Sequence, residues 1–156
     1  MSVNHPGGDP NANLYAQLKR DVLERVPQIV AVEYVPDDVE ARQLRAIFDP
    51  DRLDPPTGPE PPELLIAWYR GTPHDWFRVD FADPNTGFHA GWHQDEDHPE
   101  LGRTHFQYTT DDKSDRWGVT FEHRTPSIIL WKIVEALLED VYPTYRSPNN
   151  DGRHQR

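Results

Sequence analysis

The chain has 156 residues, no cysteine and a formal net charge of -11, from 27 acidic and 16 basic residues. That length is typical of one domain with a sizeable core, and the lack of cysteine excludes disulfides, thiol nucleophiles and cysteine-ligated metals. The acidic balance argues against an extensive nucleic-acid-binding surface. No segment approaches the ~20 apolar residues of a membrane span, and no signal-peptide pattern is visible. We therefore expect a cytoplasmic protein that contacts no membrane.

The basic residues are unusual in kind as well as in number. Only three of the 16 are lysines, Lys19, Lys113 and Lys132. An acidic surface with few lysines is typical of proteins adapted to high salt, where dissolved ions screen the repulsion between carboxylates. The composition therefore favours a salt-adapted, halophilic protein, and an ordinary acidic cytosolic protein is the alternative.

The chain opens with a polar segment, a helix and a strand. Residues 1–12 are rich in proline and glycine and are predicted to form a disordered tail. Asn13 can cap a helix with an apolar stripe, and Pro27 ends it. The β-branched stretch at 28–35 predicts the first strand.

The next stretch contains one ambiguous element and one long connection. Residues 39–48 fit either a strand or a helix, and we favour the strand because the neighbouring elements suggest an antiparallel meander. Residues 49–62 carry six prolines and are predicted to be a stiff surface loop. The apolar stretch at 63–70 predicts a central strand.

Residues 76–82 and 88–93 form the clearest hairpin signal in the sequence, with turn residues at 83–87. Strict alternation separates an apolar row from a polar row. The apolar row comprises Phe77, Val79, Phe81, Phe88, Ala90 and Trp92. The polar row comprises Arg78, Asp80, His89, Gly91 and His93. A slip of one residue would mix these rows, so the pattern also predicts the register.

Two alternating segments and a helix complete the predicted fold. Strands are expected at 103–109 and 117–123, joined by a polar turn at 111–115, with His105 facing outward. Thr125 and Pro126 start a helix that Pro143 ends.

These elements predict an α+β fold, in which an antiparallel sheet meander carries an N-terminal and a C-terminal helix on one face. The single domain is expected to span 13–142, and 143–156 is predicted to be a disordered tail.

Four histidines lie between positions 89 and 105, and they are the main candidates for chemistry. Imidazole exchanges a proton near neutral pH. Together with a guanidinium from Arg78 or Arg103, histidines could remove the 2′-hydroxyl proton of RNA and protonate the leaving oxygen. Trp92 is a candidate for stacking against a base, although a tryptophan at strand spacing is more often a core residue. The charged loop that carries His98 also fits a simple solvated surface.

The same region offers ligands for a metal ion, namely His93, Asp95, Asp97, His98 and His105. However, His89 and His93 lie four residues apart on a strand, roughly 13 Å, and cannot share one ion. The spacing matches no zinc motif. We therefore predict neither a metal nor another cofactor, with a metal in the 93–105 loop as the alternative.

The stretch FRVDFADPNTGFHAGWHQDEDHPEL, followed by RTHFQY and a proline-capped helix, resembles the TumE-like toxins of toxin–antitoxin systems. The matching positions are Phe77–Phe81, Asn85–Gly87, Trp92, Asp97–Leu101, Thr104–His105 and Thr125–Pro126. Two features differ from the family pattern. Asp97 replaces the first of two histidines before Pro-Glu, and the second histidine-rich patch keeps only His105.

The resemblance implies an endoribonuclease toxin that pairs with an antitoxin protein. His98 and His105 are the positions that carry over, as its acid and base. The residue types add His93 as a further catalytic candidate and Arg103 as the phosphate contact, and they make Arg78, Trp92 and Asp97 the candidates that bind the RNA substrate. A homodimer is a further expectation. The rival interpretation is a non-catalytic binding module that docks a protein partner through its sheet face or a helix.

Overall fold

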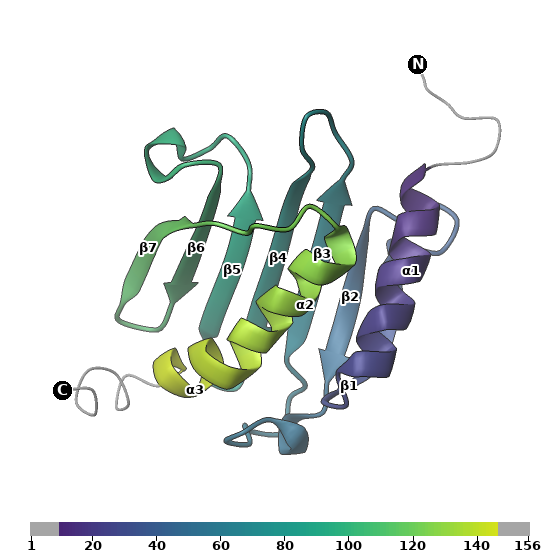
Figure 1. Cartoon of the computed structure of the whole chain (residues 1–156). Helices are drawn as coiled ribbons and strands as arrows, with labels where there is room; N and C mark the ends of the chain where they lie inside the picture. The colour runs from purple at the N-terminus through teal and green to yellow at the C-terminus, as the bar shows by residue number, and fades with distance from the viewer. Residues whose placement is uncertain (1–9, 147–156) are drawn as a thin grey trace.

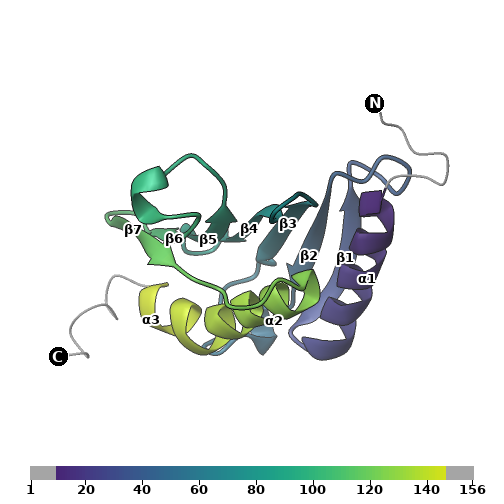
Figure 2. The same cartoon turned by 45° about the horizontal axis from the view of Figure 1, so that its top comes forward.

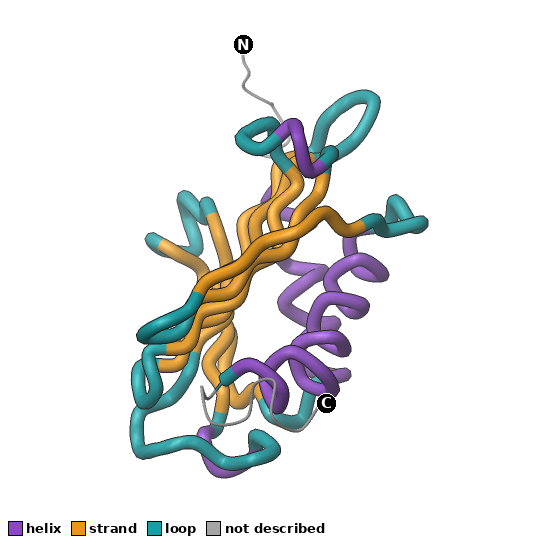
Figure 3. The backbone as a smooth tube through the Cα atoms, turned by 90° about the vertical axis from the view of Figure 1, so that its left-hand side faces the viewer, coloured by secondary structure: helices purple, strands orange, loops and turns teal. Residues whose placement is uncertain are grey.

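Seven strands form one antiparallel sheet in chain order, and the helices cover one of its faces (Figures 1 and 3). The computed structural model describes residues 10–146, so the parts of the predicted tails at 1–9 and 147–156 lie outside the described residues. Within that range, no helix has the length and apolar character needed to cross a membrane. The predicted α+β class is confirmed. We call the uncovered side of the sheet its outer face.

The elements follow one another as a meander between helices. The strands are β1 (Ile29–Val35), β2 (Gln43–Phe48), β3 (Glu63–Tyr69), β4 (Trp76–Asp83), β5 (Phe88–Gln94), β6 (Thr104–Thr109) and β7 (Ser114–Val119). The helices are α1 (Pro10–Arg25), α2 (Pro126–Ala136), a π-helical turn η3 (Leu137–Val141) and α3 (Tyr142–Tyr145), with short 3-10 turns at η1 (Pro50–Arg52) and η2 (Pro99–Leu101).

The core lies between the sheet and the helices. Figure 2 shows α1 beside β1 and β2, while α2 and α3 extend under the sheet toward β7. At the centre, Trp68 is fully buried and stacks on Phe77, with ring centroids 4.4 Å apart. The hydroxyl of Tyr15 on α1 accepts a hydrogen bond from the Trp68 backbone N–H at 3.0 Å. Helix and sheet are thus joined by both packing and a buried hydrogen bond.

The register of the predicted hairpin is confirmed. Val79 lies opposite Trp92 and Asp80 opposite Gly91, so the apolar row faces the helices and the polar row lies on the outer face. The turn is held by the buried carboxylate of Asp83, which accepts hydrogen bonds from its own loop and from Thr57 at 2.8 Å. The proline-rich segment is therefore anchored to this hairpin, and it also buries Leu53.

Several predicted boundaries differ in the structure. Helix α1 begins at Pro10 rather than at Asn13, because proline fits the first turn of a helix, where its missing N–H is not needed. Residues 39–42 precede β2, since the Asp37 carboxylate accepts the N–H groups of Val39 and Glu40 and forms a local turn. Strand β7 begins three residues early because Thr110 N–H donates to Lys113 O and closes a tighter turn, and it ends at Val119, so the predicted strand residues 120–123 lie in the connection to α2.

The prediction that Pro143 ends the last helix is wrong. The π-helical turn η3 inserts before it, and Pro143 then lies in the first turn of α3, where no helical N–H is required of it. The buried Tyr142 hydroxyl donates to Pro55 O at 2.6 Å and holds this segment on the proline-rich loop. The domain therefore extends to at least Tyr145.

Candidate functional site

Three histidine rings lie in a row on the outer face of the sheet. His105 is in the middle, with its ring centroid 5.1 Å from that of His93 and 4.9 Å from that of His98, and both contacts are edge-to-face. His93 and His105 are directly paired across β5 and β6. His98 comes from the loop at 95–103 that folds over them. The sequence-predicted histidines are thus brought together, and we call these three residues the histidine row.

One end of the histidine row is held by a carboxylate. His93 Nε2 lies 2.6 Å from Asp80 Oδ1, and since a carboxylate only accepts hydrogen bonds, Nε2 is the donor. The Asp80 side chain reaches His93 across Gly91. A Cβ at Gly91 would lie 2.2 Å from Asp80 Oδ1 and 3.0 Å from His93 Nε2. Gly91, which lies between His89 and His93 on β5, therefore leaves the space that the Asp80–His93 pair occupies.

Burial favours the neutral form of His105, the middle histidine of the row. His105 is 1% exposed, and this desolvation lowers its pKa, with the neighbouring His93 acting in the same direction. Its Nε2 lies 3.2 Å from Gln107 Oε1, a contact that counteracts part of the effect. Because the amide oxygen accepts, the proton of the neutral ring is on Nε2 and Nδ1 carries the basic lone pair. At neutral pH, His105 is thus a proton acceptor.

The other end of the row is partly exposed. The His98 side chain is 27% exposed, and its Nδ1 lies 3.5 Å from Glu100 Oε2, where the two form an ion pair once the ring is protonated. The loop that carries it is closed by Asp95 N–H donating to Arg103 O at 3.1 Å. It also rests on β7, where a Cβ at Gly118 would lie 2.3 Å from Leu101 O. His98 is therefore the member of the row that is most accessible to solvent.

The remaining predicted site residues differ in position. Arg103 is exposed at the base of the loop, Asp97 is exposed on it, and Arg78 is exposed on the outer face opposite His93. Trp92 is 4% exposed and packs against Phe106 under the helices. Alternation places it on the face opposite to its neighbour His93, so it is a core residue rather than a substrate contact.

Sequence reasoning did not assign Asp80 and Gln107 to the site. The signal for Asp80 was present, because the register places it opposite Gly91, on the same face as His93. Gln107 lies two residues after His105, on the same face of β6, and the strand period of two could have identified it. The expectation that His105 faces outward is correct for the sheet, but the loop that covers it leaves it buried.

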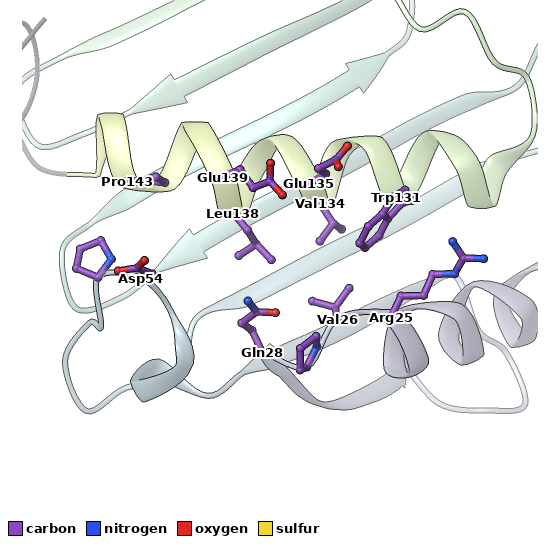
Figure 4. Close-up of a pocket in the computed structure, with 12 residues that line it drawn as sticks. Arg25, Val26, Gln28, Asp54, Trp131, Val134, Glu135, Leu138, Glu139 and Pro143 are labelled. Atoms are coloured by element: carbon purple, nitrogen blue, oxygen red, sulfur yellow. The ribbon is translucent and has the colours of Figure 1, made fainter.

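Cavities lie on both faces of the sheet. A cleft of about 380 Å³ on the outer face is lined by Arg78, Asp80, His89, His93 and Gln107 among others. A larger groove of about 630 Å³ separates α1, α2 and the proline-rich loop. Figure 4 shows Trp131 and Val134 of α2 and Leu138 of η3 projecting into it. That groove contains no histidine, so the outer face is the better candidate for acid–base chemistry.

Residues 10–146 lack the ligand geometry of a metal site. Among these residues, no three or more His, Asp or Glu side chains form a group that could hold a metal ion. In the histidine row, His93 Nε2 bonds to the Asp80 carboxylate and His105 Nε2 bonds to the Gln107 amide oxygen.

Comparisons of this chain with models of protein families, with curated proteins and with solved structures find no match.

The burial of His105 predicts a pH-dependent stability. Its pKa is lowered in the folded protein, so at mildly acidic pH the unfolded chain binds a proton there more readily than the folded protein does. The stabilisation is complete above the ordinary histidine pKa of about 6.5 and is lost as the pH falls through the folded value. Urea unfolding should show a larger loss of stability between pH 7.5 and 5.5 for the wild type than for His105→Gln. Equal losses would contradict this assignment.

Proposed function

We propose that this protein is the salt-adapted toxin of a toxin–antitoxin pair, and that it cleaves RNA without requiring a metal ion. The observation that supports this most is the histidine row, in which Asp80 holds one end and the partly exposed His98 forms the other. Neighbouring imidazoles in different environments are suited to act as an acid and a base. The resemblance of the His98 and His105 segments to TumE-like toxins points in the same direction.

The two histidines have complementary roles in this proposal. His105, neutral because it is buried, accepts the 2′-hydroxyl proton when the loop at 95–103 shifts to admit the RNA. The 2′-oxygen then attacks the adjacent phosphorus, and His98 in its protonated form donates a proton to the leaving 5′-oxygen. Asp80 and His93 orient His105 from behind, while the exposed guanidinium of Arg103 stabilises the charge on the phosphate.

The partner in this proposal is an antitoxin protein that binds the toxin in the cytoplasm and keeps it inactive. The groove between α1 and α2 is a suitable surface, because it combines exposed parts of Trp131 and Leu138 with the carboxylates of Asp54, Glu135 and Glu139. Arg25 is the one basic residue in its lining. A basic amphipathic segment of the antitoxin would match both its apolar floor and its acidic rim.

Growth of host cells after induction tests the proposal. Wild type should arrest growth, and a His98→Ala, His105→Ala double variant that circular dichroism shows to be folded should not. The matched control is His123→Ala, which removes an exposed histidine outside the row and should arrest growth like wild type. If wild type and both variants arrest growth, the proposed toxin function is retained, but the histidine row is not its active site.

If wild type leaves growth unchanged, the rival function replaces the proposal. The groove described above favours that rival, since a groove of about 630 Å³ with a partly exposed tryptophan is suited to dock a protein segment without any chemistry. The protein would then be a binding module.

A further inference from the structure

A trough crosses the outer face beside the histidine row, and it extends beyond the residues of the proposed chemistry to Arg116 on β7. The strand register places Asp80, Gly91, Gln107 and Arg116 in one line across β4 to β7. Two clefts of about 380 Å³ each follow this line and share the residues from Gln107 to Thr109. Gly91 has no side chain, so it forms part of the floor of the trough.

The lining of the trough is rich in hydrogen-bond donors. Arg78 and His89 contribute exposed side chains on one side, and Arg116 contributes a guanidinium on the other. Two carboxylates also line these clefts. Asp80 pairs with His93, and Asp115 alternates with Arg116 on β7 and therefore points toward the helix-facing side, opposite Tyr108. The outer face thus presents two guanidinium groups beside one carboxylate that is already paired. In a chain with a net charge of -11, this arrangement favours an anionic ligand, and arginine is well suited to phosphate.

The separation of the two arginines suits an extended anion. Arg78 is on β4 and Arg116 is on β7, three strand spacings apart and two residues out of register, which corresponds to roughly 16 Å between their backbones. A single phosphate group meets both guanidinium groups only if both side chains extend toward each other. A chain of phosphates can contact Arg78 and Arg116 together while it passes His93 and His105, which share a cross-strand row with Arg78.

We propose that the trough binds the phosphodiester backbone of single-stranded RNA across β4 to β7, with Arg78 and Arg116 as its phosphate ligands. This inference rests on the proposed function in taking RNA as the ligand. It adds the path of the strand and assigns a role to Arg116, which no motif in the sequence indicated.

Binding of a fluorescein-labelled ten-nucleotide uridine RNA, measured by fluorescence polarisation, tests the trough. All proteins carry His98→Ala and His105→Ala, so that the RNA stays intact. Adding Arg78→Ala and Arg116→Ala should weaken binding by at least about tenfold and reduce the salt slope by about 1.4, because two phosphate contacts with a single strand are lost. The charge-matched control, Arg20→Ala with Arg124→Ala, removes two exposed arginines outside the trough and should change binding by less than about twofold.

The inference is overturned if the control weakens binding as much as the trough variant does, or if the RNA does not bind. It is also overturned if uridine monophosphate competes as strongly as the RNA at equal concentration, since the site would then take one phosphate only. The result is separable from the growth test. If wild type arrests growth but the Arg78→Ala and Arg116→Ala changes leave RNA binding unaffected, the trough proposal fails and the toxin function stands. If RNA binds through the trough but wild type does not arrest growth, the toxin function fails and the trough proposal stands.

Discussion

His105→Ala is expected to slow RNA cleavage by about 10²–10⁴-fold, because that is the usual contribution of a positioned acid or base. His105 combines the features that a base needs. Burial lowers its pKa, Gln107 defines its protonated nitrogen, and both neighbouring imidazoles contact its ring. The measurement is the initial rate of cleavage of a labelled RNA with the purified protein at saturating RNA.

The control for this experiment is His123→Ala, which should cleave at the wild-type rate. Asp80→Asn adds a more specific readout, because it keeps the shape of the side chain and removes the charge that orients His93. Its pH–rate profile should shift along the pH axis, whereas a purely structural effect would lower the rate equally at every pH. A His105→Ala rate within about threefold of wild type would show that this imidazole takes no part in the reaction.

Trp68→Ala is expected to lower the free energy of unfolding by about 3–5 kcal/mol, the usual cost of removing a large buried aromatic side chain. Trp68 is fully buried and stacks on Phe77, and its indole N–H donates to Asp75 Oδ2 at 2.9 Å. The variant therefore leaves a cavity and also removes a partner of Asp75. Since domains are stable by only about 5–15 kcal/mol, this loss is a large fraction of the total.

Urea unfolding monitored by circular dichroism measures this change, with Tyr69→Ala as the control. Tyr69 is the next residue on β3 but is half exposed on the outer face, so its replacement should cost less than about 1 kcal/mol. Similar losses for the two variants would mean that the core is not centred on Trp68.

The alternation of side chains was sufficient to predict the architecture. The rows of β4 and β5 differ so clearly in polarity that only one register buries Phe77, Val79 and Phe81 together, and the structure has that register. Boundaries were less predictable, because they depend on single contacts. The start of β7 is set by the Thr110–Lys113 turn, and the passage of the last helix through Pro143 depends on the π-helical turn before it.

Composition and pattern by themselves were enough to predict the α+β class, the hairpin register and the region of the chain that contains the histidine row, because polarity repeats are local properties of the chain. The state of each histidine was decided by tertiary structure. A loop that folds over the sheet buries His105, and the Asp80 carboxylate reaches His93 across a glycine on the neighbouring strand. Burial and pKa depend on groups that are distant in sequence, so no local pattern could predict them.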